Sequence, residues 1–313
     1  MKRDPFIASG LRGLVSRIGR GFGNRIASAI PATAPAGMKI VIAGAARSGT
    51  TALYYALKQS LPRNYAHKFE PREYVPTRAD NGVLAKIIIN SVKRIESFDS
   101  FDKRIFLIRD PRDVAVSAVL YRIYNAREPI DPAQLDHYLR GVEQKHRDPG
   151  SISLVELQSR LSPLLRIDNL EPYNRRRARS DFGAEHPDYF AYKYEDFIAG
   201  RYDALEDYLG FKITFSGAVD AKHNRVARTK DAGGWRDWFT PEDVEYYRPL
   251  WQEFLVKYGY DPDWELSASP RIAAEHSTAY VKRMLEEGVT SRRKATTGLR
   301  ARIKALRRSL GQS

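Results

Sequence analysis

The stretch KIVIAGAARSGTT, residues 39–51, decides the fold expected for the chain. Its first part, residues 39–43, is a short apolar run rich in β-branched residues, which predicts a buried strand. The following TALYYALKQSL predicts a helix that ends before Pro62. Between them, Gly44 and Gly49 let the backbone curl so that successive N–H groups point at an anion beside a helix N-terminus. The stretch therefore predicts a phosphate-binding loop.

This loop differs from the nucleoside-triphosphatase loop GxxxxGK[ST] at one position. Thr50 occupies the place of the lysine that reaches the β- and γ-phosphates, and the positive charge lies three residues earlier, at Arg47. A P-loop kinase of small molecules would need Lys at position 50 and an acid that holds magnesium. Such a kinase is kept as the alternative enzyme.

Strand and helix patterns alternate after this loop. Apolar runs predict strands over residues 86–90, 104–108 and 189–194, and helices are predicted over 114–124, 201–211 and 240–260. The polar stretch 126–188 contains at least two helical patches. This order predicts an α/β fold with a P-loop-type parallel sheet flanked by helices on both faces, whose ligands bind at the carboxyl ends of the strands.

A second anion-binding motif follows the strand predicted over 104–108. In RDPRDVAVS, Arg109 stands at the strand end and Ser117 lies two turns into the next helix. The guanidinium presents a planar charged fork to a phosphate, and the hydroxyl adds another donor. Both motifs therefore lie at the ligand-binding edge of the predicted sheet.

Together these motifs resemble those of sulfotransferases that use 3′-phosphoadenosine 5′-phosphosulfate (PAPS). RSGTT resembles the family's 5′-phosphosulfate loop, and the second motif resembles its 3′-phosphate motif. RTKDAGGWR, residues 228–236, resembles the late RKGxxGDWK loop that closes over the 3′-phosphate, with departures at Thr229, Lys230 and Gly234. The resemblance covers residues 39–260 and implies these cofactor-binding residues: Arg47, Ser48, Gly49, Thr50, Thr51, Arg109, Ser117, Arg228, Thr229 and Lys230.

The resemblance implies in-line transfer of a sulfuryl group from PAPS to an acceptor hydroxyl, with no metal required. Catalysis then rests on positioning and electrostatics, and Arg47 neutralises the charge that builds on the departing phosphate. Trp235 has two interpretations, as a packing aromatic or as part of the nucleotide site.

The acceptor hydroxyl needs a general base. Phe69-Glu70-Pro71 resembles the FEP segment of carbohydrate sulfotransferases, which implies Glu70 as the base and a saccharide or glycolipid as the acceptor. His67 is the alternative base, since cytosolic sulfotransferases of phenols and alcohols use a histidine in this neighbourhood. A surface glutamate without a catalytic role is the third interpretation. Lys93 either steadies the transferring group or is simply solvated.

The formal charge of +14 is concentrated in two terminal arms. Residues 1–39 carry seven basic residues and one acidic residue, and residues 289–313 carry eight basic residues and no acidic one, so the body between them is neutral. Apolar residues from Leu299 to Leu310 recur at helical spacing, which predicts a basic amphipathic helix that suits an anionic membrane surface. No aromatic residues interleave with these bases, so nucleic acid is not expected as a partner.

Composition sets the broad class. Hydrophobic residues make up 42% and charged residues 29%, a globular balance, and the absence of cysteine excludes a disulfide scaffold, a thiolate metal site and a cysteine nucleophile. We expect a basic N-terminal extension over 1–37, a sulfotransferase domain over 38–265 and a helical, basic C-terminal tail over 266–313. A cytoplasmic location is expected, with or without membrane association. A non-catalytic anion- or nucleotide-binding protein is the alternative outside the enzymes.

Overall fold

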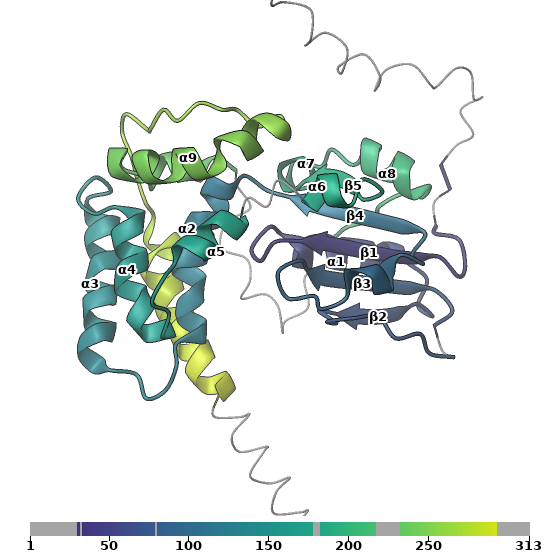
Figure 1. Ribbon diagram of the computed structural model, residues 1–313, viewed down its shortest axis with the longest axis horizontal. Helices are drawn as coiled ribbons and strands as arrows, with labels where there is room; N and C mark the ends of the chain where they lie inside the picture. The colour runs from purple at the N-terminus through teal and green to yellow at the C-terminus, as the bar shows by residue number, and fades with distance from the viewer. Residues whose placement is uncertain (1–29, 32, 79, 178–181, 217–231, 293–313) are drawn as a thin grey trace, which may run out of the picture.

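The computed structural model describes residues 30, 31, 33–78, 80–177, 182–216 and 232–292 (Figure 1). Three residues of the predicted 3′-phosphate loop, Arg228, Thr229 and Lys230, lie outside the described residues. So do most of the basic N-terminal extension and residues 293–313 of the C-terminal arm.

Five parallel strands form one sheet in the order β2-β3-β1-β4-β5. The order places the first strand in the middle, as expected for a doubly wound sheet. This confirms the α/β fold and the parallel sheet. The strands are β1 (Lys39–Gly44), β2 (Ala66–Phe69), β3 (Val83–Ile88), β4 (Lys103–Ile108) and β5 (Phe190–Lys193).

The helices are α1 (Thr50–Ser60), α2 (Pro111–Tyr121), α3 (Pro132–Arg147), α4 (Leu154–Leu165), α5 (Glu171–Arg177), α6 (Phe182–Glu185), α7 (Tyr194–Ile198), α8 (Asp203–Leu209) and α9 (Pro241–Lys257). Short 3₁₀ turns are η1 (Ile95–Phe98), η2 (Arg122–Asn125), η4 (Gly234–Asp237) and η5 (Ala274–His276), and residues 278–292 are also helical. Two helix boundaries lie close to those predicted. Gly210 ends α8 with φ 82°, and Thr240 caps the start of α9 in a capping box with Asp243.

Helices cover both faces of the sheet, as predicted. Because strand side chains alternate between faces, Val41 and Ala43 of β1 join a core with α2, α3, α4 and α9, whereas Ile40 and Ile42 join a second core with α1 and α8. Figure 1 shows α2, α3, α4 and α9 gathered beside the sheet, at the end where β4 runs into α2. That end of the sheet carries the loops that the sequence singles out.

Three elements differ in extent from the sequence expectations. The segment 66–69 is a strand, although its AHKF pattern gives no strand signal; it is a short edge strand with only partly buried side chains. The second predicted strand begins earlier and ends at Ile88 instead of residue 90. The helix after β4 ends at Tyr121 and continues as a 3₁₀ turn.

The helix over residues 278–292 belongs to the packed core. Tyr280, Val281 and Met284 are buried and join the same cluster as α2 and α9. Gly288 lies against η2 so closely that a Cβ there would meet the Tyr124 carbonyl oxygen at 2.3 Å. The core therefore continues past residue 265, where the sequence suggested that the domain ends.

Candidate functional site

The loop between β1 and α1 has the backbone of an anion-binding turn. Arg47 and Gly49 both have positive φ, 74° and 94°. Gly49 is the N-cap of α1, where no side chain caps the helix, so the first N–H groups of α1 are available to an anion. A Cβ at Gly49 would lie 2.1 Å from the Tyr194 ring, so both the backbone conformation and the packing require glycine.

Three of the predicted phosphate ligands meet at one point. The Arg47 guanidinium donates to the Ser117 hydroxyl through Nε and Nη2, at 3.0 and 2.9 Å. Arg109 donates from Nη1 to the Arg47 carbonyl oxygen at 3.3 Å. Residues from β1's loop, the end of β4 and the middle of α2 thus form one cationic cluster at the carboxyl edge of the sheet.

Aromatic rings hold the two guanidinium groups in place. Arg47 lies 4.1 Å from the centre of the Tyr121 ring, and Arg109 lies 4.5 Å from that of Tyr194. Burial lowers the pKa of Arg47, and Tyr280 of the C-terminal helix is close enough to affect it electrostatically. A guanidinium still keeps its proton at neutral pH, so the cluster carries two fixed positive charges.

Two buried polar atoms of this cluster lack a hydrogen-bond partner among the described residues. They are Arg109 Nε and Ser48 Oγ, and both residues line the same small internal cavity of about 10 Å³, the size of one water. Buried donors without a partner are rare in proteins. The rest of that cavity is apolar and its volume suits a single water, so these two atoms do not mark the place of a phosphate.

The fit to a phosphorylated nucleotide rests on the Arg47, Arg109 and Ser117 side chains, whose guanidinium and hydroxyl groups are donors of the kind that a phosphate accepts from. Thr50 and Thr51, also predicted ligands, are buried in the first turn of α1.

Glu70 lies where β2 ends, paired with a buried lysine that the sequence analysis missed. Lys86 of β3 donates to the Glu70 carboxylate and lies 4.5 Å from the centre of the Phe69 ring. The Lys86 side chain is 2% exposed, whereas that of Glu70 is 48% exposed. Burial lowers the pKa of Lys86, Glu70 raises it and Arg47 lowers it, so this pair lies within electrostatic range of the phosphate loop.

His67 lies farther from the strand ends than Glu70. Parallel register aligns His67 with Leu84 and Phe69 with Lys86, so Glu70 is three residues nearer to the carboxyl edge, roughly 10 Å along the strand. His67 is exposed beside the Tyr54 ring, and burial, together with Lys58, lowers its pKa. Lys93 is exposed and its backbone N–H donates to the Arg72 carbonyl oxygen.

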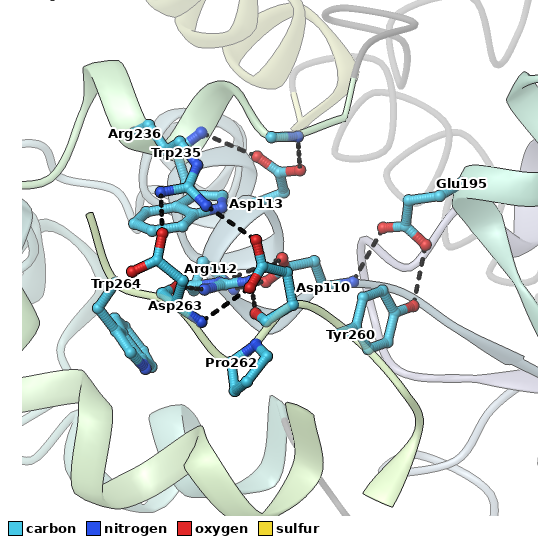
Figure 2. A network of polar contacts seen from close by, with 12 residues as sticks. Asp110, Arg112, Asp113, Glu195, Trp235, Arg236, Tyr260, Pro262, Asp263 and Trp264 are labelled. Carbon is cyan, nitrogen blue, oxygen red and sulfur yellow. Dashed lines mark hydrogen bonds and ion pairs between the residues drawn. The ribbon is translucent and has the colours of Figure 1, made fainter. Parts of the chain in front are cut away.

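The RDPRD segment also builds the scaffold around the cluster. Asp110 caps α2 and pairs with Arg112 at 2.7 Å. Arg112 donates to the backbone carbonyl groups of Asp261 and Asp263 (Figure 2). Its guanidinium carbon lies 4.2 Å from the Trp235 ring centre. The sequence analysis assigned these residues to a phosphate-binding motif. It did not predict their contacts with residues far along the chain.

Asp113 holds the segment that follows residues 217–231. Its two carboxylate oxygens accept from the N–H groups of Gly233 and Trp235 at 2.7 and 3.0 Å (Figure 2). Burial raises the pKa of Asp113, and the positive charge of Arg109 acts in the opposite direction. Trp235 is 1% exposed and belongs to the core, which favours the packing interpretation for this aromatic residue.

Over the described ranges, no group of three or more His, Asp or Glu side chains is arranged to hold a metal ion. In the same part of the chain, no helix has both the length and the apolarity needed to cross a bilayer.

No protein-family model and no curated protein matches the chain. Among solved structures, retinol dehydratase with retinol and PAP is similar at a TM-score of 0.42 and 15% identity, over 72% of this chain and 82% of that chain. Mouse sulfotransferase SULT7A1 with PAP has a TM-score of 0.42 and 13% identity, over 72% and 88%. Retinol dehydratase with androsterone and the inactive cofactor PAP has a TM-score of 0.42 and 16% identity, over 72% and 82%. Likenesses this distant do not decide the function.

Proposed function

We propose that this chain is a sulfotransferase that moves a sulfuryl group from PAPS to an acceptor hydroxyl. The observation that carries the proposal is the meeting of Arg47, Ser117 and Arg109 at the carboxyl edge of the sheet. PAPS has a phosphosulfate and a separate 3′-phosphate, and a site with the buried Arg109, the half-buried Arg47 and an uncapped helix N-terminus offers donors for both.

The residues have distinct roles in transfer. PAPS supplies the activated sulfuryl group, whose bond to the 5′-phosphate oxygen breaks as the bond to the acceptor oxygen forms. Arg47 and the N–H groups at the start of α1 stabilise the negative charge that develops on the departing phosphate. Arg109 and Ser117 hold the 3′-phosphate and so orient the nucleotide.

Glu70 is the proposed general base that takes the proton of the acceptor hydroxyl. Its carboxylate is half exposed at the strand end, where an acceptor can reach it, and Lys86 orients it. His67 is the less suitable base, because it lies three residues farther down the same edge strand.

The P-loop kinase is disfavoured by Thr50 and by the state of Asp110 and Asp113, the two acids that follow Arg109. A kinase needs a carboxylate that is free to hold magnesium near the loop. Asp110 is occupied by Arg112 and by the capping of α2, and Asp113 is occupied by the N–H groups of Gly233 and Trp235. Holding magnesium would break these buried contacts.

Nucleotide specificity is the first test. Isothermal titration calorimetry with adenosine 3′,5′-bisphosphate should show binding, and MgATP should bind more weakly. Arg109→Ala should lower the affinity at least about 100-fold, since a buried charged donor to a phosphate contributes about 3 kcal/mol. Arg104→Ala is the control, because Arg104 pairs with Asp188 at the opposite end of β4. Preference for MgATP in the wild type would contradict the proposal.

Transfer itself separates an enzyme from a non-catalytic binding protein. Single-turnover transfer of labelled sulfate is measured against saccharides, glycolipids and apolar alcohols, the last including the retinol and androsterone of the compared structures. Glu70→Gln should keep nucleotide affinity and lose transfer by about 10²- to 10⁴-fold, the usual contribution of a general base. The FEP segment favours a saccharide hydroxyl as the acceptor. Unchanged transfer by Glu70→Gln would remove Glu70 from the mechanism.

A further inference from the structure

A second hollow, separate from the phosphate loop, lies between η2, the end of α4 and the helix over 278–292. Its volume is about 380 Å³, within the range of small-ligand sites. Its charged lining residues are Arg127, Arg166, Arg292 and Glu128, so positive charge prevails.

Contacts between its walls hold the hollow in shape. Arg292 donates to the Tyr124 carbonyl oxygen at 2.6 Å, and Arg166 donates to that of Glu128 at 3.0 Å. The close approach of Gly288 to Tyr124 fixes the C-terminal helix against η2. The arginines are thus set on three different segments around one space, in which planar guanidinium groups are suited to a carboxylate or sulfate.

Tyrosine rings connect this hollow with the phosphate loop. Tyr121, whose ring lies under the Arg47 guanidinium, stacks on Tyr124 with ring centres 5.8 Å apart, and Tyr124 lines the hollow. Both tyrosines are half-buried, so neither is enclosed in the core. Two stacked rings, with steps of 4.1 Å and 5.8 Å, thus lead from the Arg47 guanidinium to the lining of the hollow.

From this arrangement we infer that the hollow binds an anionic group, carboxylate or sulfate, of the acceptor saccharide while the reacting hydroxyl lies at Glu70 and Arg47. The inference rests on the proposed function and specifies its substrate class: an acidic saccharide. Arg127 and Arg166 are the residues available to the ligand, because both are exposed and the side chain of Arg127 has no hydrogen bond or ion pair within the described ranges.

The test compares one saccharide with and without its charge. Calorimetry measures binding of a hyaluronan hexasaccharide and of its carboxyl-reduced form to the full chain, with adenosine 3′,5′-bisphosphate present. We expect the wild type to bind the acidic form about tenfold or more tightly than the reduced form, since a charge-assisted contact contributes at least that factor. Arg127→Gln with Arg166→Gln should abolish this difference, whereas Arg140→Gln, an exposed arginine on α3, should keep it.

Each outcome decides the inference. Loss of the preference in the double variant, with unchanged affinity for adenosine 3′,5′-bisphosphate, supports it. A preference that survives the double variant, or no preference in the wild type, overturns it.

Binding of the wild type and of the double variant to phosphatidylglycerol vesicles is compared in parallel. If the double variant binds these vesicles less well and the wild type shows no saccharide preference, the inference is overturned in favour of a lipid headgroup. Failure of the nucleotide to bind would contradict the proposed function instead, and the saccharide titration without nucleotide would still test the hollow.

Discussion

Lys86 places a positive charge within the sheet. Because its side chain is almost fully buried, that charge loses its hydration, which costs stability. Its ammonium group contacts Glu70 and lies over the Phe69 ring. A buried ion pair is often no more stable than a well-packed apolar residue of similar volume. We therefore interpret Lys86 as a positioning residue that orients Glu70, at some cost in stability.

Lys86→Met should raise stability and lower transfer. The pKa of Lys86 is lowered because burial outweighs the attraction of Glu70. A lysine whose folded-state pKa lies below its unfolded-state value destabilises the fold while it is charged, and this penalty fades as the pH rises through the folded-state pKa. We expect the free energy of unfolding at pH 7 to rise by about 1–2 kcal/mol, with a smaller gain at pH 10, while transfer falls about tenfold.

Urea unfolding at both pH values and single-turnover transfer check this prediction. Lys68→Met is the matched control: Lys68 lies on β2 and pairs with Asp80 at 3.4 Å, but it is 30% exposed. It should show no gain in stability at either pH. A loss of stability in Lys86→Met at pH 7 would show that the ion pair is stabilising.

At the scale of elements, the first turn of α2 organises the region around the cluster. Asp110, Arg112 and Asp113 lie within four residues, yet they contact residues between 233 and 263. The turn follows β4 directly, so the segment that supplies Arg109 also anchors the chain after α9. Glu195 of α7 adds to this anchor, because it accepts from Asp110's N–H and from the Tyr260 hydroxyl (Figure 2).

Arg112→Lys should destabilise the protein despite keeping the charge. The guanidinium of Arg112 serves Asp110 and two backbone carbonyl groups at once and packs on the rings of Trp235 and Trp264. An ammonium group cannot reproduce this planar fork. We expect a loss of about 2–3 kcal/mol in the free energy of unfolding, measured by urea denaturation.

Arg201→Lys provides the comparison for that substitution. Arg201 also pairs with an aspartate, Asp196, at 2.6 Å, but its side chain is 64% exposed. Replacing it should change the free energy of unfolding by less than about 0.5 kcal/mol. Equal effects of the two substitutions would mean that the buried network around Arg112 contributes little.

At the scale of the whole molecule, the C-terminal helix ties the helical layer to the cluster. Near its start it carries Tyr280, which is within electrostatic range of Arg47, and at the end of its described part it carries Arg292, which lines the second hollow. Figure 1 shows this helix, in yellow, running alongside α2. The structure describes this helix as far as residue 292, so residues 289–292 of the basic arm belong to it and residues 293–313 come after these.

Truncation should divide the roles of these two parts. Removal of residues 293–313 should leave the melting temperature nearly unchanged and reduce flotation with vesicles containing phosphatidylglycerol, because it removes seven of the arm's eight basic residues. Removal of residues 278–313 should unfold the protein, since Tyr280, Val281 and Met284 leave the core.

Vesicles of phosphatidylcholine alone serve as the uncharged control for flotation. Equal partitioning of the full chain and the chain ending at residue 292 would eliminate the membrane hypothesis. A chain ending at residue 277 that melts like the full one would show that the helix is not part of the cooperative core.

The sequence by itself determined where the predicted phosphate ligands lie in the chain and that they meet at one edge of the sheet. The loop around Arg47 and Gly49 depends on backbone conformations within a few residues, and Arg109 with Ser117 depends on one strand-to-helix junction. Because parallel strands end at a common edge, the convergence of these residues follows from their positions alone.

Only the tertiary structure decided which partners these residues have. β2 carries no strand signal of its own, and it forms because β3 offers it an edge; that pairing brings Glu70 to Lys86. The contacts of Arg112 with residues near 261 and the packing of residues 278–292 likewise join segments distant in sequence. A local motif is stabilised by its own hydrogen bonds, whereas these contacts gain their free energy from burial between segments, which no short stretch of sequence contains.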